Sequence, residues 1–326
     1  MSEFWFQLRR FGGWAIGLIG FVASLIAGWD IIGIWLESQN SISMAANIYI
    51  LAIVTIVVAI LSFRHYQTMR KEKYANIAPL LHQIVHGLRD LDTYTLEKQP
   101  AKDSSEQEYS MYLQSVEVMF GRILDQLATV FEMLTSTHCR TSIKLTYLND
   151  GSLHYYTYKR DQWSQGRCAR KDIERMKENH DPLSKNAVFT RLFEDKEDKW
   201  HYFNNDLCGD HKFTTTSMTA YKPDHAERPG PHGWFHSLQS KWPLPYRSTL
   251  ACVIRQGPFD FDPKRQSEVL GFLTVDSASR GVFVEKWDIQ LVFAVADAMF
   301  HPLKRVVVVQ GLADAASSKP KELAGN

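Results

Sequence analysis

Apolar residues are spread very unevenly along the 326-residue chain, and the two longest apolar runs both lie near its start. From Phe11 to Leu36 the only charged residue is Asp30, and residues 45–63 carry no charge at all. As a helix, each run is long enough to cross about 30 Å of hydrocarbon at about 1.5 Å per residue. The pattern therefore predicts a transmembrane hairpin over residues 1–65, with spans at about 11–36 and 45–63.

Basic residues flank this predicted hairpin on one side only. Arg9 and Arg10 precede the first span, several basic residues including Arg64 and Lys71 follow the second, and the short loop between the spans has none. The positive-inside rule then places both termini in the cytoplasm, on an inner membrane. Small residues recur at four-residue spacing in the first span, which predicts close helix packing either within the hairpin or between protomers. They are Gly13, Gly17, Gly20, Ser24 and Gly28.

Residues 66–107 form a predicted helical connector and linker. Apolar residues from Tyr74 to Leu91 alternate spacings of three and four, which is typical of a helix with one apolar face. Pro79 should kink that helix or start a new one. Residues 93–107 are polar, and Ser105 with Glu108 has capping-box spacing, which predicts a helix start there.

The next helix has the most regular periodicity of the soluble part. Its apolar residues step by three and four over three heptads, so the stripe can pack on a sheet or pair with a second chain. In the second case the chain is a parallel homodimer with this stripe as its seam, and both uses can coexist. The seam residues are Leu113, Val116, Phe120, Ile123, Leu127, Val130 and Leu134.

Strand-like segments follow the helix. Residues 139–148 and 152–158 flank Asn149-Asp150-Gly151, a strong hairpin turn because Asn and Gly tolerate positive φ. Residues 269–275 are apolar, β-branched and aromatic, as in a strand buried on both faces or at the centre of a sheet. From Glu285 the apolar spacing is again helical. An α+β domain is therefore expected over residues 108–312, with a disordered tail at 313–326.

The segment Val269–Leu303, a "GFLTVDS" strand followed by "WDIQLVFAVADAM", resembles the C-terminal end of a GAF domain. Tyr246–Ile254 resembles the GAF strand before it, and the resemblance extends loosely over residues 108–310. It implies a GAF-like antiparallel sheet flanked by helices. It also implies dimerisation through the preceding helix, so we favour the parallel homodimer over packing within one chain. Asp276, at the end of the strand, is expected to be a turn residue and not a ligand.

Residues 208–245 form a long irregular stretch, and loops of that length are commonly lids or binding loops. A small ligand is expected between this stretch and the sheet. The candidate ligand-binding residues are Asp206, His211, Tyr221, Trp234, Arg247 and Thr249. The spacings Cys208-x2-His211 and His232-x3-His236 also allow a zinc site, with dispersed histidines as the alternative.

Composition and motifs restrict the function. The net charge of +1 gives no reason to expect nucleic acid as a partner, and the four cysteines contain no CxxC pair. No catalytic motif occurs, so no enzyme activity is expected, and no cofactor is indicated. The chain is predicted to be a membrane-anchored sensor that binds a small molecule or nucleotide and signals through dimeric helices. The alternatives are a ligand-gated effector that perturbs the membrane, resembling nucleotide-gated two-span effectors of bacterial phage defence, and a redox or metal sensor.

Overall fold

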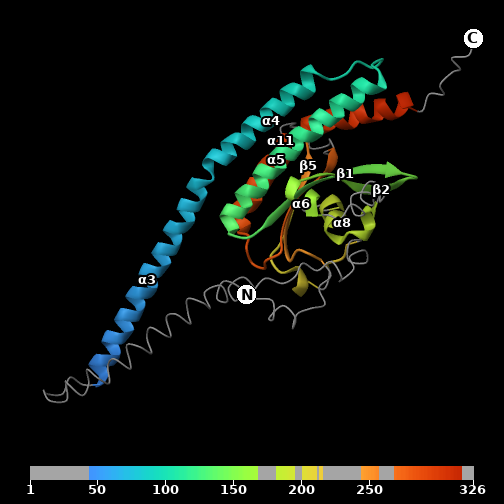
Figure 1. Ribbon diagram of the computed structural model, residues 1–326. Helices are drawn as coiled ribbons and strands as arrows, with labels where there is room; N and C mark the ends of the chain where they lie inside the picture. The colour runs from blue at the N-terminus through green and yellow to red at the C-terminus, as the bar shows by residue number, and fades with distance from the viewer. Residues whose placement is uncertain are drawn as a thin grey trace, which may run out of the picture. The chain divides into compact units, whose positions relative to one another are not determined.

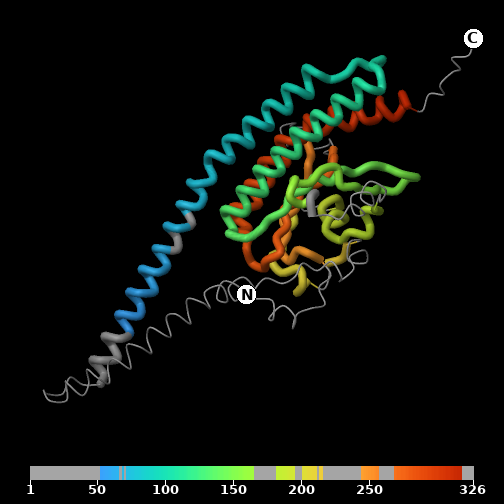
Figure 2. The backbone as a smooth tube through the Cα atoms, in the orientation of Figure 1, coloured from blue at the N-terminus to red at the C-terminus, as the bar shows by residue number. Residues whose placement is uncertain are grey.

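The computed structural model describes residues 44–167, 181–194, 200–210, 213–215, 244–256 and 268–317. By its internal contacts the chain divides into two compact units, Met1–Asn76 and Ile77–Asn326. Figures 1 and 2 show the path of the chain through each unit.

In the first unit, the second apolar run lies within helix α3 (Met44–Asn76). Large apolar side chains are exposed on several sides of α3, among them Ile53, Ile56 and Leu61. Among the described residues, no helix combines the length and the apolar character needed to cross a membrane. The first apolar run, 11–36, and its five small packing residues lie outside the described residues. The transmembrane hairpin thus stays a prediction from the sequence.

Two long helices open the second unit where the sequence predicted helix starts. Helix α4 (Ala78–Glu97) begins with Pro79 in its first turn, where proline's missing N–H costs nothing. Helix α5 (Glu106–Thr135) begins with a capping box: the Ser105 hydroxyl accepts the Glu108 N–H at 3.3 Å, and the Glu108 carboxylate accepts the Ser105 N–H at 2.7 Å. Both predicted helix starts are confirmed.

A six-stranded antiparallel sheet forms the centre of the second unit, with the strand order β3-β2-β1-β6-β5-β4. The hairpin between β1 and β2 turns at Asp150 (φ 48°) and Gly151 (φ 75°), as the Asn-Asp-Gly sequence predicted. The strands are β1 (Cys139–Asn149), β2 (Ser152–Arg160), β3 (Asp181–Pro182), β4 (His201–Asn204), β5 (Ser248–Arg255) and β6 (Val269–Ser277).

Helices cover both faces of this sheet, unequally. Helix α5 packs on β1 and β2, and the C-terminal helix α11 (Glu285–Ser317) packs on β5 and β6, with α4 against both helices (Figure 1). The opposite face receives the short helix α8 (Ala187–Glu194), whose side chains join an apolar cluster with Phe272. The remaining described helical turns are α6 (Gln162–Arg167), η1 (Leu183–Lys185) and η2 (Leu207–Gly209). The predicted α+β architecture, an antiparallel sheet flanked by helices, is confirmed.

Helix α11 is longer than the sequence predicted. The disordered tail was expected from residue 313, but the helix continues to Ser317 and includes Pro302. Pro302 is buried together with Leu303, Val306 and Val309, so packing holds the helix together across the position where the proline lacks an N–H. Residues 318–326 lie outside the described residues.

The predicted dimer seam on α5 is buried within a single chain. Val116, Phe120, Ile123, Leu127 and Val130 are each at most 2% exposed. Because α5 contacts α4, α11, β1 and β2, this apolar stripe already has its partners. Leu113 and Leu134, at the two ends, are half-buried. The apolar stripe of α5 therefore packs within one chain, as the first alternative predicted. The homodimer stays a prediction, and it would need a different surface.

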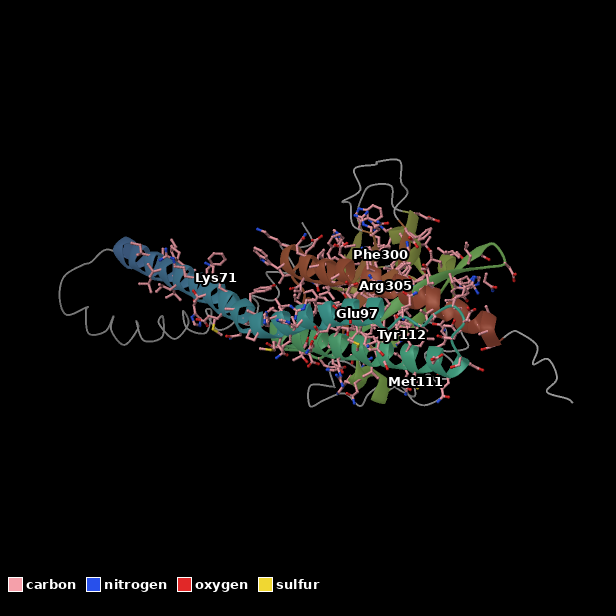
Figure 3. The ribbon with its side chains drawn as sticks, turned by 90° about the horizontal axis from the view of Figure 1, so that it is seen from above. Lys71, Glu97, Met111, Tyr112, Phe300 and Arg305 are labelled. Carbon is pink, nitrogen blue, oxygen red and sulfur yellow. The ribbon has the colours of Figure 1, made fainter. Side chains whose placement is uncertain are left out.

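Helices α4, α5 and α11 form the main helical layer, and one polar and one aromatic contact join α11 and α5 to α4. Arg305 of α11 donates from Nη1 to the Asp92 carboxylate at 2.6 Å and to the Thr95 hydroxyl at 2.9 Å, both on α4. Tyr112 of α5 stacks on Tyr94 of α4, with ring centroids 6.0 Å apart. Figure 3 shows Arg305 and Tyr112 where α4, α5 and α11 lie side by side.

Candidate ligand-binding site

Two kinds of residue alternate along β1, and they belong to different faces of the sheet. The Thr141 hydroxyl donates to the Leu124 carbonyl of α5 at 2.9 Å, which places Thr141 and the buried Ile143 on the helix-covered face. Side chains alternate along a strand, so Arg140, Ser142 and Lys144 lie on the opposite face. That alternation puts two basic residues of a central strand away from the main helical layer.

Strand register brings further polar residues beside them. Residues paired across an antiparallel ladder share a face. Arg140 pairs with Asp276 of β6, and Asp276 pairs with Thr249 of β5. Ser142 pairs with Thr274 and also with Arg160. We call this set of residues the polar patch: Arg140, Ser142, Lys144, Arg160, Thr249, Thr274 and Asp276.

Short hydrogen bonds tie members of the polar patch together. The Thr249 hydroxyl donates to the Asp276 carboxylate at 2.5 Å, and the hydroxyls of Ser142 and Thr274 are 2.8 Å apart. Lys144 Nζ donates to Thr157 of β2 at 2.6 Å. Three of the patch's polar side chains, Thr249, Ser142 and Thr274, are at most 6% exposed. The patch is thus an ordered polar surface within the domain.

Asp276 is the acidic group of the patch, and burial raises the pKa of its carboxyl. The Thr249 hydrogen bond and the positive charges of Lys144, Arg160 and Arg140 oppose this increase without cancelling it. Burial also raises the pKa of the nearby Tyr246 phenol, and the Asp276 charge adds to the effect. Three basic side chains therefore surround the half-buried Asp276, and two of them, Arg140 and Arg160, also act on the Tyr246 phenol.

The Nε atom of Arg160 is buried and has no hydrogen-bond partner among the described residues. A buried unpaired donor costs free energy unless a ligand or water completes it. Next to the polar patch, the same face of the sheet is apolar, with Phe272, Val253 and Tyr155 packed against α8. An apolar wall beside a few oriented polar groups is the usual composition of a small-molecule site.

The structure places the predicted ligand-binding residues in different surroundings. Thr249 lies in the polar patch. Asp206 forms an ion pair with Arg280 instead, at 3.1 Å. The backbone of Arg247, just before β5, bonds to Ser277 and Leu207. His211, Tyr221 and Trp234 lie outside the described residues, so their part of the prediction is untested.

The predicted metal site also lies mostly outside the described residues. Of its four expected ligands, only Cys208, half-buried after β4, is described, whereas His211, His232 and His236 are not. Across the described parts of the chain, no three His, Cys, Asp or Glu side chains gather in a way that could hold a metal ion. The zinc hypothesis at Cys208 stays untested.

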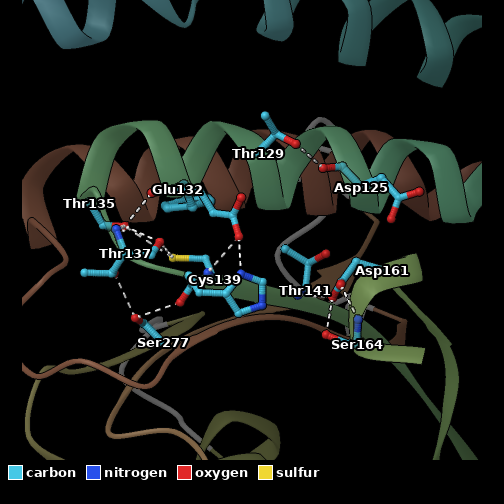
Figure 4. Close-up of polar contacts among 12 residues, drawn as sticks. Asp125, Thr129, Glu132, Thr135, Thr137, Cys139, Thr141, Asp161, Ser164 and Ser277 are labelled. Carbon is cyan, nitrogen blue, oxygen red and sulfur yellow. Dashed lines mark hydrogen bonds and ion pairs between the residues drawn. The ribbon is translucent and has the colours of Figure 1, made fainter. Parts of the chain in front are cut away.

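On the helix-covered face, polar groups connect the end of α5 to the strands. The Thr135 hydroxyl donates to the Phe131 carbonyl at 2.6 Å, and Thr137 and Ser277 hydroxyls lie 3.1 Å apart (Figure 4). Burial raises the pKa of the Cys139 thiol in this network to about 11, and it also raises the pKa of Cys252. Thiols of that kind are poor nucleophiles at neutral pH, so these groups are structural.

The sequence prediction missed most of the polar patch. Asp276 was expected to be a turn residue, but it is still within β6 and faces Arg140. A usable signal was present: basic and hydroxyl residues alternate at Arg140, Ser142 and Lys144, in a strand whose intervening residues are apolar or bonded to a helix. Arg160 gave no local signal, because only the register of β2 on β1 brings it there.

No protein-family model and no curated protein matches the sequence. Among solved structures, the chain is similar to the GAF domain of an Acinetobacter phosphoenolpyruvate-protein phosphotransferase, with 12% identity, a TM-score of 0.33, and coverage of 70% of this chain and 94% of that one. It is also similar to a type II free methionine-R-sulfoxide reductase from Thermoplasma acidophilum, with 9% identity, a TM-score of 0.33, and coverage of 58% and 96%.

A third similar structure is the phytochrome photosensory core module of Stigmatella aurantiaca, with 10% identity, a TM-score of 0.34, and coverage of 73% of this chain and 39% of that one. All three TM-scores are below 0.5, so no inference about fold or activity rests on these likenesses. The architecture and the polar patch stand on the geometry of the chain itself.

Proposed function

We propose that residues 108–312 are a GAF-like regulatory domain that binds a small anionic ligand, bearing a carboxylate or phosphate group, at the polar patch. One observation carries the proposal: Arg140, Lys144 and Arg160 surround Asp276 on one face of the central strands. Arginine guanidinium groups match the geometry of carboxylates and phosphates. The excess of basic over acidic groups in the patch favours an anion.

The free-energy cost of placing charged side chains in the polar patch supports the interpretation that the patch has a function. Charged side chains on a buried sheet face cost free energy that apolar residues of similar size would not. The neighbouring positions on the same face, Ala251, Val253 and Phe272, are apolar and form a core cluster. A departure from apolar packing at the centre of a sheet is expected where function requires it.

We infer binding and not catalysis from the chemistry of the patch. Its members are basic groups, hydroxyls and one carboxyl, and the pKa of that carboxyl is raised. Among the described cysteines, Cys139 and Cys252 are buried on the opposite face. The patch suits the recognition of charge and hydrogen bonds, and ligand binding there can shift a regulatory equilibrium by its differential affinity for two states.

Membrane attachment through residues 1–65 belongs to the same proposal. It is supported by the uncharged run 45–63 and by the exposed apolar side chains of α3, such as Ile53 and Leu61. An all-apolar helix surface is expected to be covered by lipid or protein. Signalling through the helices that follow, to a partner protein or to the anchor, is proposed with it.

Native mass spectrometry of the full chain, purified from its own host and transferred under gentle conditions, tests the ligand proposal. A co-purifying small anion is expected, and Arg160→Gln should lose it while the exposed α5 control Arg122→Gln keeps it. Equal loss or equal retention in both variants would argue against the polar patch as the site. Circular dichroism of both variants establishes that they are folded.

A further inference from the structure

Helix α4 carries two histidines one turn apart whose rings face each other. His82 Nε2 and His86 Nε2 are 2.9 Å apart, and the ring centroids are separated by 4.3 Å at 77°. Residues four apart lie on the same side of a helix. His82 is exposed and His86 is half-buried, so the pair borders solvent and lies apart from the polar patch of the sheet.

Arg89 fixes which nitrogen of His86 carries the proton. Arg89 Nη2 lies 2.7 Å from His86 Nδ1, and a guanidinium group can only donate. His86 Nδ1 must therefore accept, which leaves the proton of the neutral ring on Nε2. That proton is shared with His82 Nε2, which accepts it. A hydrogen bond thus joins the Nε2 atoms of His82 and His86, and both nitrogens are of the type that binds transition metals.

We propose that His82 and His86 form a chelating site for a divalent transition-metal ion of the zinc, nickel or copper type. Imidazole nitrogens bind such ions at about 2.0–2.1 Å, so two nitrogens bound side by side lie roughly 2.9–3.3 Å apart. The observed 2.9 Å between the Nε2 atoms is already in that range. Two histidines at this helical spacing supply neighbouring ligands in known zinc sites.

Metal binding requires the Arg89 side chain to move away from His86, and an acidic side chain lies close enough to accept it. With both Nε2 atoms on the metal, each ring carries its proton on Nδ1, and the Nδ1–H of His86 would oppose the N–H groups of Arg89. Arg89 must then turn away, and the carboxylate of Asp90 is near its Nε at 3.8 Å. Arg89 therefore competes with the metal, by its charge and by its hydrogen bond.

The site is open, with two protein ligands. Nowhere in the described ranges do three or more His, Cys, Asp or Glu side chains form a metal-holding group. Water would complete the coordination, as in exchangeable sites. This proposal is independent of the ligand proposed for the sheet and of the untested ligands around Cys208.

Titration calorimetry with Zn²⁺, on full-length protein carrying no polyhistidine tag, tests the site. His82→Gln and His86→Gln should each weaken binding at least about tenfold, since a chelate becomes a single ligand, whereas Arg89→Gln should strengthen it. His154→Gln is the control, because His154 is a half-buried strand histidine with Nδ1 3.2 Å from the Ser152 carbonyl. Unchanged Zn²⁺ affinity in His82→Gln would overturn the proposal.

Copper(II) electron paramagnetic resonance counts the nitrogens directly. Two nitrogen ligands are expected in the wild-type chain and in Arg89→Gln, and one in either histidine variant. Because both histidines border solvent on a helix surface, their replacement should leave the fold intact, and far-ultraviolet circular dichroism checks this. A single nitrogen in the wild-type chain, or an equal loss of binding in His154→Gln, would show dispersed surface binding and refute the paired site.

Discussion

Thr249 and Asp276 are hydrogen-bonded partners across neighbouring strands, with 2.5 Å between the threonine hydroxyl and the carboxylate oxygen. Together they place a carboxyl group on the sheet face opposite the main helical layer, among Arg140, Lys144 and Arg160. Burial raises the pKa of this carboxyl even though the basic groups and the hydroxyl oppose the increase. The charged form of Asp276 is thus held at a cost to the folded chain.

Asp276→Asn should change how stability depends on pH. A carboxyl group whose pKa is higher in the folded than in the unfolded chain binds its proton more tightly when folded, so its contribution to stability falls as pH rises. The decline begins near the unfolded pKa of about 3.9 and ends once the folded carboxyl has also ionised. Asparagine keeps the acceptor for Thr249 and carries no charge.

Urea unfolding across the acidic range measures this effect. The free energy of unfolding of Asp276→Asn should gain on that of the wild-type chain as pH rises, and then run parallel to it. Asp103→Asn, in the exposed linker before α5, serves as the control. If the free energy of unfolding of Asp276→Asn instead fell relative to that of the wild-type chain as pH rises, the raised pKa of Asp276 would be contradicted.

Two glycines should respond in opposite directions to the same substitution. A Cβ atom on Gly271, in β6, would lie 1.9 Å from the Lys144 carbonyl oxygen, whereas one on Gly311, in α11, meets nothing within 4 Å. Gly271→Ala should therefore cost about 3 kcal/mol or more, because backbone must move. Gly311→Ala should stabilise by up to about 1 kcal/mol through helix propensity. Thermal unfolding of both variants measures the contrast, and equal effects would refute it.

Phe120→Ala tests whether the α5 stripe belongs to the core of one chain. Phe120 is 0% exposed and packs edge-to-face on Tyr158 of β2, with ring centroids 5.7 Å apart. The substitution should cost about 3–5 kcal/mol. The neighbouring Val118, 47% exposed, should cost less than about 1 kcal/mol when replaced by alanine. Because the contact is within one chain, the loss in Phe120→Ala should not depend on protein concentration; a strong dependence would restore the dimer seam.

The elements with strong local signals were predictable from the sequence. The capping box at Ser105, the Asn-Asp-Gly turn and the start of a helix near Pro79 each depend on a few adjacent residues, and each is confirmed. What a helix packs against is not a local property. The three-four stripe through Phe120 fits a sheet and a second helix equally well, and only the burial of the folded chain decides between them.

The polar patch could not be predicted from the sequence, because it too depends on contacts between distant residues. Arg140 and Asp276 are far apart in the sequence, and Arg160 reaches the patch through a register that includes an irregularity in the β1–β2 pairing at Ile143 and Lys144. A strand of alternating polarity indicates that one of its faces is special, but not which distant residues share that face. Thr249 is among the predicted ligand-binding residues, because a ligand is expected between the sheet and residues 208–245, but that prediction does not identify Asp276 as its partner.

Arg305 should contribute more to stability than its neighbour Lys304, although each has an acidic partner. Arg305 Nη1 contacts the carboxylate and carbonyl of Asp92 and the Thr95 hydroxyl, and its side chain is 23% exposed. Lys304 is 44% exposed, pairs with the 47% exposed Glu268, and lies 5.7 Å from the ring centroid of Phe300. Arg305→Gln should cost about 1–2 kcal/mol, after allowance for solvent screening, and Lys304→Gln less than about 1 kcal/mol.

A double-mutant cycle with Asp92→Asn isolates the charged pair that joins α11 to α4. Removing both partners should cost less than the sum of the single losses, by about 0.5–1 kcal/mol, and 1 M salt should reduce that coupling because Asp92 is 48% exposed. The hydrogen bond from Arg305 to Thr95 survives Asp92→Asn, so Arg305→Gln should remain the more damaging of the two single changes. Strictly additive losses, unchanged by salt, would mean that the charge pair of Arg305 and Asp92 contributes nothing measurable to the packing of these two helices.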